Sequence, residues 1–291
     1  MAELALRALD CGILCLDRLG ILLAANPTAL RLLVAQEQAV LGRPLCEAFK
    51  LIEPDGTPVA LTWDSDHLDK HEPLPPGACV RDGLGRLIAV SGSISPLVDD
   101  QRTAIGAVIS FRDATDERAR TSLLTHRATH DALTGLPIRW LLQDRMRHAV
   151  ARAKRQVSQI AVLALDLDGF KAVNDLYGHS YGDQVLADVA RFLGLRKREA
   201  DTFGRLGGDE FVLIQQDVTD RSEPAVLAER MIDTLIAWAR KQPKTLQLGL
   251  SVGIAFYPIH GDGPDQLLKA ADKALYEAKR SGGCAYRVAE S

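Results

Sequence analysis

Two acidic stretches of the chain, each next to an apolar run, combine residue types that bind metal ions and phosphates. Asp166 and Asp168 follow the apolar run 160–165, and Gly-Gly-Asp-Glu at 207–210 precedes the strand-like run 211–215. If the two runs form neighbouring antiparallel strands, the turn at 207–210 lies at the same sheet edge as Asp166. Carboxylates that converge there would suit Mg²⁺, which prefers oxygen ligands and keeps substrate phosphates in its coordination shell. Either acidic pair taken alone is more typical of a plain hairpin turn.

The segment that must position these acids, residues 131–291, alternates strand-like and helical patterns. Apolar residues have helical spacing over 185–193, and an apolar stripe over 264–280 is followed by the helix stop Ser-Gly-Gly. A third strand-like run covers 248–257. The order of these patterns predicts an α+β domain in which helices surround one central sheet.

The rest of the chain predicts a separate first domain and a connecting helix. Residues 1–113 mix short strand-like runs with turn signals such as Pro-Asp-Gly at 54–56. Asn26-Pro27 predicts the start of a helix, because Asn caps helices and Pro suits the first helical position. Residues 114–130 are charged and contain neither Gly nor Pro, so they predict one helix that acts either as a passive spacer or as a signalling lever.

The composition restricts the class of protein. With 47% hydrophobic and 25% charged residues over 291 positions, the chain is typical of a globular protein of two domains. The net charge of −3 predicts no nucleic-acid partner, and no apolar run approaches the roughly 20 residues that cross a bilayer. We therefore expect a cytoplasmic protein without membrane contact. The five cysteines are scattered without metal-binding spacing, which favours small buried apolar residues.

Short segments of the second half resemble, in order and spacing, the signature of GGDEF-domain diguanylate cyclases. They are RLGGDEF at 205–211, DALTGLP at 131–137, DLDGFK at 166–171, NDLYGH at 174–179, Gly182-Asp183, SVGI at 251–254 and ADKALYEAK at 271–279. The resemblance covers about residues 126–288. It implies a nucleotidyl-cyclase-like fold and an enzyme that condenses two GTP molecules into cyclic di-GMP and two pyrophosphates.

The resemblance implies roles for the acidic residues. Asp166, Asp209 and the main-chain carbonyl of Leu167 match the ligands of Mg²⁺, with Mn²⁺ as an alternative ion. Asp209 also matches the catalytic base, and Glu210 beside it supports metal or substrate binding. The metal would neutralise phosphate charge and lower the pKa of the attacking hydroxyl.

The resemblance also implies a set of substrate-binding residues. Asn174 and Asp183 match the pair that reads guanine, whose N–H donors and carbonyl acceptor suit an amide and a carboxylate. His179 matches a further substrate contact. Phosphate contacts are implied for the loop that contains Phe170 and Lys171, and for Lys279.

Two further expectations concern assembly and regulation. Each such domain holds one GTP, so catalysis requires two domains face to face and predicts a parallel homodimer. Arg198 and Asp201 resemble the family's RxxD site, where cyclic di-GMP binds and inhibits its own synthesis. The alternative for this pair is a surface ion pair, which contributes little stability.

The chain departs from the family pattern at two places. Ile138 stands where Asn is common, and Gly283 stands where the family has a second phosphate-binding arginine. We therefore expect a weakened triphosphate clamp, unless Arg280 or Arg287 replaces the missing side chain.

The first domain resembles a PAS sensor module, and its ligand is not predicted by the sequence. The resemblance rests on GILCLD at 12–17, ANPT at 25–28 and FRDATDER at 111–118. His67 and His71 lie in or next to an expected helix at 61–70, where some PAS domains place a haem ligand, although a solvated acidic helix is the favoured interpretation. The predicted domains are thus 1–113, 114–130 and 131–291.

Two other functions remain open from the sequence. The second half could be a catalytically weak module that binds GTP or cyclic di-GMP and signals through contacts. The chain could also be a partner-regulated scaffold in which the first half does the main work. The complete acidic set favours the cyclase, and Gly283 favours the weak module.

Overall fold

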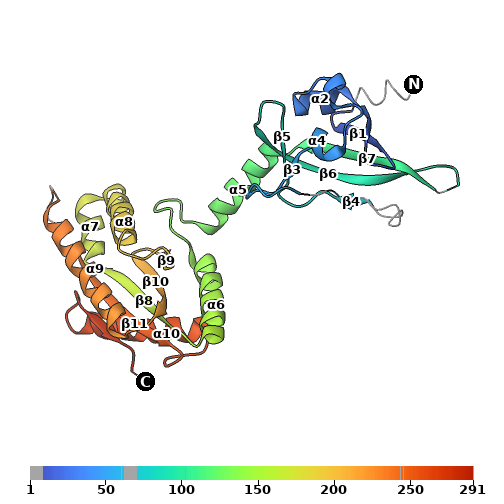
Figure 1. The fold of residues 1–291 in the computed structure, drawn as a ribbon. Coiled ribbons are helices and arrows are strands. Elements are labelled where there is room, and N and C mark those ends of the chain that lie inside the picture. Colours follow the sequence, from blue (N-terminus) through green and yellow to red (C-terminus); the bar gives the residue numbers. More distant parts are fainter. Residues whose placement is uncertain are drawn as a thin grey trace. The chain divides into compact units, whose positions relative to one another are not determined.

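The chain forms two compact units, Met1–Leu124 and Thr125–Ser291, in a computed structural model (Figure 1). The structure describes residues 9–59, 61, 71–101, 103–242, 244 and 246–290. Each unit has its own sheet and its own hydrophobic core. Over these described residues, no helix combines the length and the apolar character needed to cross a bilayer.

The first unit is an antiparallel sheet with short helices packed on it, as the resemblance to PAS domains implies. The sheet order is β2-β1-β7-β6-β5-β3, and β4 pairs with β6. Its strands are β1 Gly12–Asp17, β2 Leu22–Ala25, β3 Leu51–Ile52, β4 Glu72–Pro73, β5 Cys79–Arg81, β6 Leu87–Val98 and β7 Ala104–Asp113. Its helices are α2 Pro27–Leu33, α3 Glu37–Val40 and α4 Leu45–Ala48.

Helix α2 confirms the predicted capping. Asn26 precedes α2 in an extended conformation, and its side chain accepts a hydrogen bond from the Ala29 amide over 2.8 Å. Pro27 occupies the first helical position. The helix then packs Ala29 and Leu33 into a core shared with the sheet.

The helix α5, Thr115–Thr129, is the predicted connecting helix and joins the two units along the chain. Asp113 caps its start by accepting a hydrogen bond from the Thr115 amide over 2.8 Å. Arg118 binds its first turn to the first unit by donating to the carbonyls of Gly77, Ala78 and Val90 at 2.8–2.9 Å. No residue within α5 is buried.

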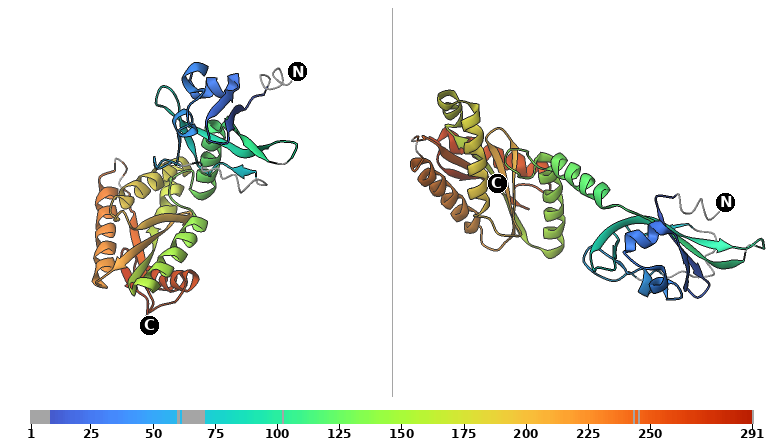
Figure 2. Two further views of the ribbon diagram at one scale, coloured as in Figure 1. Left: turned by 45° about the vertical axis from the view of Figure 1, so that its right-hand side comes forward. Right: turned by 90° about the horizontal axis from the view of Figure 1, so that it is seen from above.

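The second unit has a five-stranded sheet with helices on both faces (Figure 2). The order is β12-β11-β8-β10-β9, in which only β12 and β11 are parallel. The strands are β8 Gln159–Asp168, β9 Thr202–Gly207, β10 Glu210–Val218, β11 Gly249–Tyr257 and β12 Tyr286–Val288. The helices are α6 Arg139–Gln156, α7 Phe170–Tyr177, α8 His179–Gly194, α9 Ser222–Arg240 and α10 Pro264–Arg280.

The central strand β8 explains the unbroken apolar run of the sequence. Its residues alternate between two cores: Ala161, Leu163 and Leu165 pack with α7, α8 and α9, whereas Ile160 and Val162 pack with α6 and α10. A strand covered on both faces needs apolar residues at every position. The strand is longer than predicted, because its ladder with β11 continues to Asp168. The two acids therefore lie within the end of β8 and do not follow it.

Candidate active site

The two acidic stretches meet at one edge of the sheet, as the sequence predicts. Strands β8 and β10 are antiparallel neighbours, and their register places Glu210 opposite Asp166. The turn between β9 and β10 has only Gly208 and Asp209 between its strands. Gly208 has φ +53°, a left-handed conformation that glycine adopts without a side-chain clash. Asp209 is half-buried in this turn, beside the end of β8.

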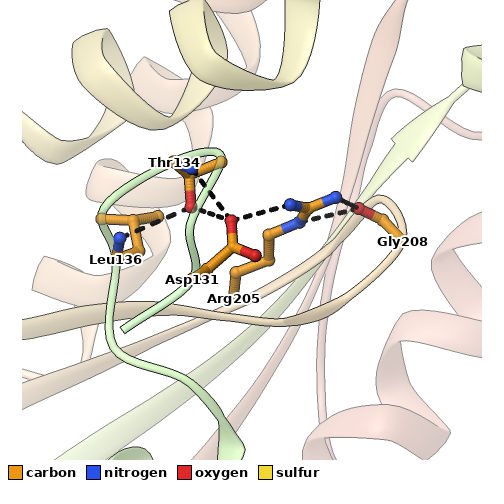
Figure 3. A network of polar contacts seen from close by, with 5 residues as sticks. All are labelled: Asp131, Thr134, Leu136, Arg205 and Gly208. Atoms are coloured by element: carbon orange, nitrogen blue, oxygen red, sulfur yellow. Dashed lines mark hydrogen bonds and ion pairs between the residues drawn. The ribbon is translucent and has the colours of Figure 1, made fainter. Parts of the chain in front are cut away.

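Arg205 holds this turn in place (Figure 3). Its Nε and Nη2 donate to the Gly208 carbonyl at 2.9 and 2.7 Å, and its Nη1 donates to Asp131 Oδ1 at 2.8 Å. Asp131 also accepts from the amide and the hydroxyl of Thr134. The Arg205 side chain is 11% exposed, so it is held between the turn and the segment that follows α5.

The pKa of Asp131 is lowered in this network. Burial opposes its ionisation, but the hydrogen bonds from Thr134 and Arg205 and the positive charge of Arg205 outweigh burial together. Both Asp131 and Arg205 belong to motifs that the sequence reveals, but the resemblance implied no role for either residue. An arginine two positions before a Gly-Gly turn is the signal that could have indicated one.

Asp166 lies deep in the site and is neutralised by a lysine. Lys279 Nζ on α10 is 2.6 Å from Asp166 Oδ1. Burial raises the pKa of Asp166; Lys279 opposes this rise, whereas the charges of Asp209 and Asp168 add to it. Three carboxylates thus lie close enough to influence one another at this edge. Their combined negative charge favours the binding of a cation there.

Asp168 has a different environment from Asp166 although only one residue separates them. It accepts hydrogen bonds from the Ser251 hydroxyl at 2.9 Å and from the Cys284 amide at 2.8 Å. These bonds attach the chain after α10 to the end of β8. A Cβ at Gly283, where φ is +74°, would lie 3.1 Å from the Asp168 carboxyl carbon. Gly283 therefore occupies a tight, left-handed position.

The donors at this edge fit a hard divalent cation. Asp166 and Asp209 supply carboxylates, and Leu167 can contribute only its main-chain carbonyl, because its side chain is a hydrocarbon without ligand atoms. Among the described residues, no group of three or more His, Cys, Asp or Glu side chains has metal-binding geometry. A cation here would thus depend on two carboxylates, a carbonyl and oxygens from a bound phosphate, which suits Mg²⁺.

The helices α7 and α8 bring the predicted guanine-reading residues to one corner. Asn174 on α7 projects its side chain against the backbone of α8, because a Cβ at Gly182 would meet Asn174 Oδ1 at 1.9 Å. Only glycine allows this approach. Asp183 follows Gly182 and is exposed, and His179 is exposed at the start of α8.

The predicted phosphate loop opens α7. Gly169 has φ +80° and precedes Phe170, the first residue of the helix. Phe170 is buried in the core, so it can offer only its backbone to a ligand, whereas Lys171 is exposed. Backbone N–H groups at a helix start are unpaired within the helix and suit an anion.

The two arginines suggested as replacements for the family's second clamp residue have other surroundings. Arg280 lies over the Tyr276 ring, with 5.8 Å between the guanidinium carbon and the ring centroid. Arg287 lines a cavity with Glu229 and Asp233 on α9. Neither set of neighbours includes the carboxylates of the acidic edge.

Arg198 and Asp201 lie outside this edge, next to α9. Asp201 is 3% exposed and accepts from the Arg198 amide, so it stabilises its own turn. The Arg198 guanidinium is exposed and pairs with Glu223 over 3.0 Å. It borders a cleft of about 300 Å³, which Arg196 and Arg230 also line.

The histidine and cysteine expectations have mixed outcomes. His67 and most of the expected helix 61–70 lie outside the described residues. His71 is exposed, with Nδ1 2.8 Å from the Ser95 hydroxyl. All five cysteines lack a disulfide. Cys46 and Cys284 are exposed, so the prediction of buried cysteines is wrong for these two, and the other three are half-buried. Cys46 lies in the short helix α4, and Cys284 follows the end of α10.

Comparisons with known proteins agree with this architecture. The family model described as "Diguanylate cyclase, GGDEF domain" matches residues 128–284, and the PAS fold model matches residues 6–119. The bifunctional diguanylate cyclase/cyclic di-GMP phosphodiesterase MucR of Pseudomonas aeruginosa is 40% identical over 199 residues, 65% of this chain and 29% of its own length. Diguanylate cyclase TpbB of the same species is 39% identical over 168 residues, 57% of this chain and 39% of its own length. The chain thus spans less than half the length of these curated relatives.

A solved structure is similar as well. The crystal structure of the coiled coil and GGDEF domain of DgcB from Caulobacter crescentus, in complex with c-di-GMP, is 31% identical with a TM-score of 0.54. The similarity covers 60% of this chain and 94% of that one. Because the family model matches more than half of the chain and one sheet edge gathers the signature residues, this chain belongs to the GGDEF family, with a PAS fold in its first unit.

Proposed function

We propose that this chain is a sensor-regulated diguanylate cyclase, which condenses two GTP molecules into cyclic di-GMP and two pyrophosphates. The observation that carries the proposal is the register that sets Glu210 opposite Asp166, with Asp209 in the adjoining turn and Lys279 Nζ 2.6 Å from Asp166 Oδ1. The 3′-oxygen of each GTP attacks the α-phosphorus of the other, so two phosphodiester bonds form and close the ring. At each of the two α-phosphorus atoms, the bond to the oxygen that bridges to the β-phosphorus breaks, and one pyrophosphate leaves.

The acidic edge would perform the chemistry. Asp166, Asp209 and the Leu167 carbonyl would hold Mg²⁺, or Mn²⁺, which supplies charge neutralisation for the triphosphate when bound. Asp209 accepts the proton of the attacking 3′-hydroxyl, and Glu210 beside it supports metal or substrate binding. Lys279 exchanges its contact with Asp166 for a phosphate oxygen. The rigid Arg205 contacts keep Asp209 oriented, so less entropy is lost on reaction.

The α7–α8 corner would select guanine. Asn174 and Asp183 face a base whose edge offers both donors and an acceptor, and His179 adds a contact from the start of α8. The backbone at Phe170 and the exposed Lys171 would bind the phosphates. Because GTP is made and used in the cytoplasm, this reaction implies that the second unit works there.

Catalysis would require a homodimer, since one such site holds one GTP. The helix α5 would set the spacing of two catalytic units, and the PAS fold would regulate it through a ligand that remains to be identified. An insertion of four residues in α5 rotates the second unit by about 40° about the helix axis, and one of seven by about 20° in the opposite sense. We expect different activities from the two insertions. Equal kinetics for both would remove the lever from the proposal.

Arg198 and Asp201 would form a site for product inhibition. The exposed Arg198 guanidinium beside Arg196 and Arg230 supports this, because arginine forks bind phosphate and guanine. The carboxylate of the buried Asp201 accepts a hydrogen bond from the Arg198 amide and so fixes the backbone that carries the Arg198 side chain.

The first test is product analysis after incubation with GTP and Mg²⁺, with the Asp209→Ala variant alongside. We expect cyclic di-GMP from the wild-type protein and none from Asp209→Ala. Asp233→Ala, which removes an exposed carboxylate on α9, is the matched control and should retain activity. Binding of GTP or cyclic di-GMP without product would instead favour the weak signalling module, for which the loss of a clamp arginine at Gly283 is the supporting observation.

A further inference from the structure

Two tyrosines at the α7–α8 corner hold a lysine from a distant loop. Tyr177 ends α7 and Tyr181 lies in the first turn of α8; their rings meet edge to face, with centroids 5.3 Å apart and an interplanar angle of 62°. Lys244 Nζ lies 4.5 Å from the centroid of each ring. An ammonium within about 6 Å of an aromatic face is attracted by the negative charge of that face. Both rings therefore hold the same cation.

This contact joins parts of the chain that are far apart in sequence. Lys244 lies between the end of α9 at Arg240 and the start of β11 at Gly249. Both tyrosines also pack against the core cluster beneath α7, α8 and α9. The corner is thus fixed from the inside by the core and from the outside by Lys244.

The carboxylate that shares a cleft with Lys244 has a cationic partner of its own. A cleft of about 360 Å³ next to Tyr181 is lined by Lys244 and by one carboxylate, Asp188. Asp188 already pairs with Arg191 on the same helix. In the part of the chain that the structure describes, the two tyrosine rings are the groups found next to the Lys244 ammonium.

Tyr177 and Tyr181 each lie within one helical turn, along the chain, of a proposed guanine-reading residue. Tyr177 follows Asn174 by three positions, and Tyr181 precedes Asp183 by two. Between them the chain reverses at Gly178, which has φ +83° and whose amide donates to the Asn174 carbonyl over 2.8 Å. A change in the angle between α7 and α8 would alter the spacing of an amide and a carboxylate that must reach one guanine edge together.

We propose that Lys244 is a positioning residue for guanine recognition. It fixes α7 against α8 through the rings of Tyr177 and Tyr181, and thereby sets the separation of Asn174 and Asp183. Lys244 acts through these residues and does not touch the nucleotide. The inference rests on the proposed function, and it predicts an effect on nucleotide binding with the chemical step unchanged.

The test compares Lys244→Gln, which removes the charge and keeps a similar chain length, with Lys244→Arg, which keeps a cation over the rings. For Lys244→Gln we expect the Kd and KM for GTP to rise about three- to tenfold, with kcat unchanged. Lys244→Arg should bind GTP like the wild type. Lys241→Gln, which alters an exposed lysine three residues earlier, is the matched control and should have no effect.

Two further readouts separate positioning from general stability. The preference for GTP over ITP, which lacks the 2-amino group, should fall in Lys244→Gln, because the Asn174–Asp183 spacing is no longer held. Amide hydrogen exchange over 174–183 should become faster in that variant. Unchanged GTP affinity and exchange, or a fall in kcat alone, would overturn the inference and leave the cyclase intact. If the wild-type protein does not bind GTP, the proposed function and the inference fail together.

Discussion

Arg205 donates to Asp131 over 2.8 Å and so connects the segment that follows α5 to the turn that carries Asp209. The same guanidinium donates twice to the Gly208 carbonyl, so a displacement of Asp131 would move the turn that carries Asp209. In the proposed regulation, a signal from α5 would therefore reach the acidic edge through this one side chain.

Removal of Arg205 should impair catalysis more than folding. In Arg205→Ala, Asp209 loses the support of its turn, and we expect kcat to fall about 10- to 100-fold, the range for loss of hydrogen bonds that involve a charged group. Steady-state cyclic di-GMP production measures this. Arg147→Ala, which removes an exposed arginine paired with Asp144, is the control. An Arg205→Ala variant with wild-type kcat would contradict this role.

The Asp131 network should lose its stabilising effect in acid. The folded pKa of Asp131 lies below its usual value, so its contribution to stability is present above the unfolded pKa of about 4 and is lost as pH falls through the folded pKa. We expect Asp131→Asn to lower the unfolding temperature at pH 7 and to have a smaller effect at pH 3. A larger loss of unfolding temperature at pH 3 than at pH 7 would contradict this prediction.

Lys279 should control both phosphate binding and the protonation of Asp166. Lys279→Met removes a hydrogen bond and a charge that oppose the raised pKa of Asp166, so that pKa should rise further. The acid limb of the activity profile should then move to higher pH, and the KM for GTP should rise. Lys273→Met, at an exposed position of the same helix, is the control. An acid limb that stays at the same pH would mean that Lys279 does not control the protonation of Asp166.

The substitution Gly283→Arg, which restores the family's arginine, should destabilise the protein because of the backbone conformation at this position. Gly283 has φ +74° and lies against Asp168, so we expect Gly283→Arg to lower the unfolding free energy by about 1–2 kcal/mol, the cost of a left-handed conformation with a side chain. Thermal unfolding measures this. Gly263→Ala is the control, because Gly263 has φ −149° and open space around it. A Gly283→Arg variant with full stability and a lower KM for GTP would mean that the clamp was simply missing its side chain.

Arg198 offers a clean test of product inhibition, whereas Asp201 does not. The Arg198–Glu223 pair is exposed, and such pairs contribute at most about 1 kcal/mol, so Arg198→Ala should fold normally and lose inhibition by cyclic di-GMP. The buried Asp201 accepts backbone hydrogen bonds, and Asp201→Ala should unfold more easily. Inhibition curves for Arg198→Ala and the control Arg191→Ala decide this; equal inhibition constants would move the product site elsewhere.

Local sequence patterns were enough to indicate the family, the α+β order of the second unit, and the meeting of two acidic stretches. The patterns are an apolar run buried on both faces, helical periodicity, and a Gly-Gly turn that reverses the chain within two residues. The capping of α2 by Asn26 is local in the same sense. Structure that depends on residues close together in the sequence can be predicted from the order of residue types.

Only the folded chain shows which distant side chains contact the charged groups. Lys279 lies opposite Asp166, and Lys244 lies over two tyrosines, because α10 and the loop after α9 return to elements more than 60 residues earlier in the chain. The fold also makes Asp168 bind the chain after α10 while Asp166 stays in the site, since strand pairing with β11 sets their surroundings. Such contacts depend on the packing of whole helices and strands, which no short sequence pattern contains.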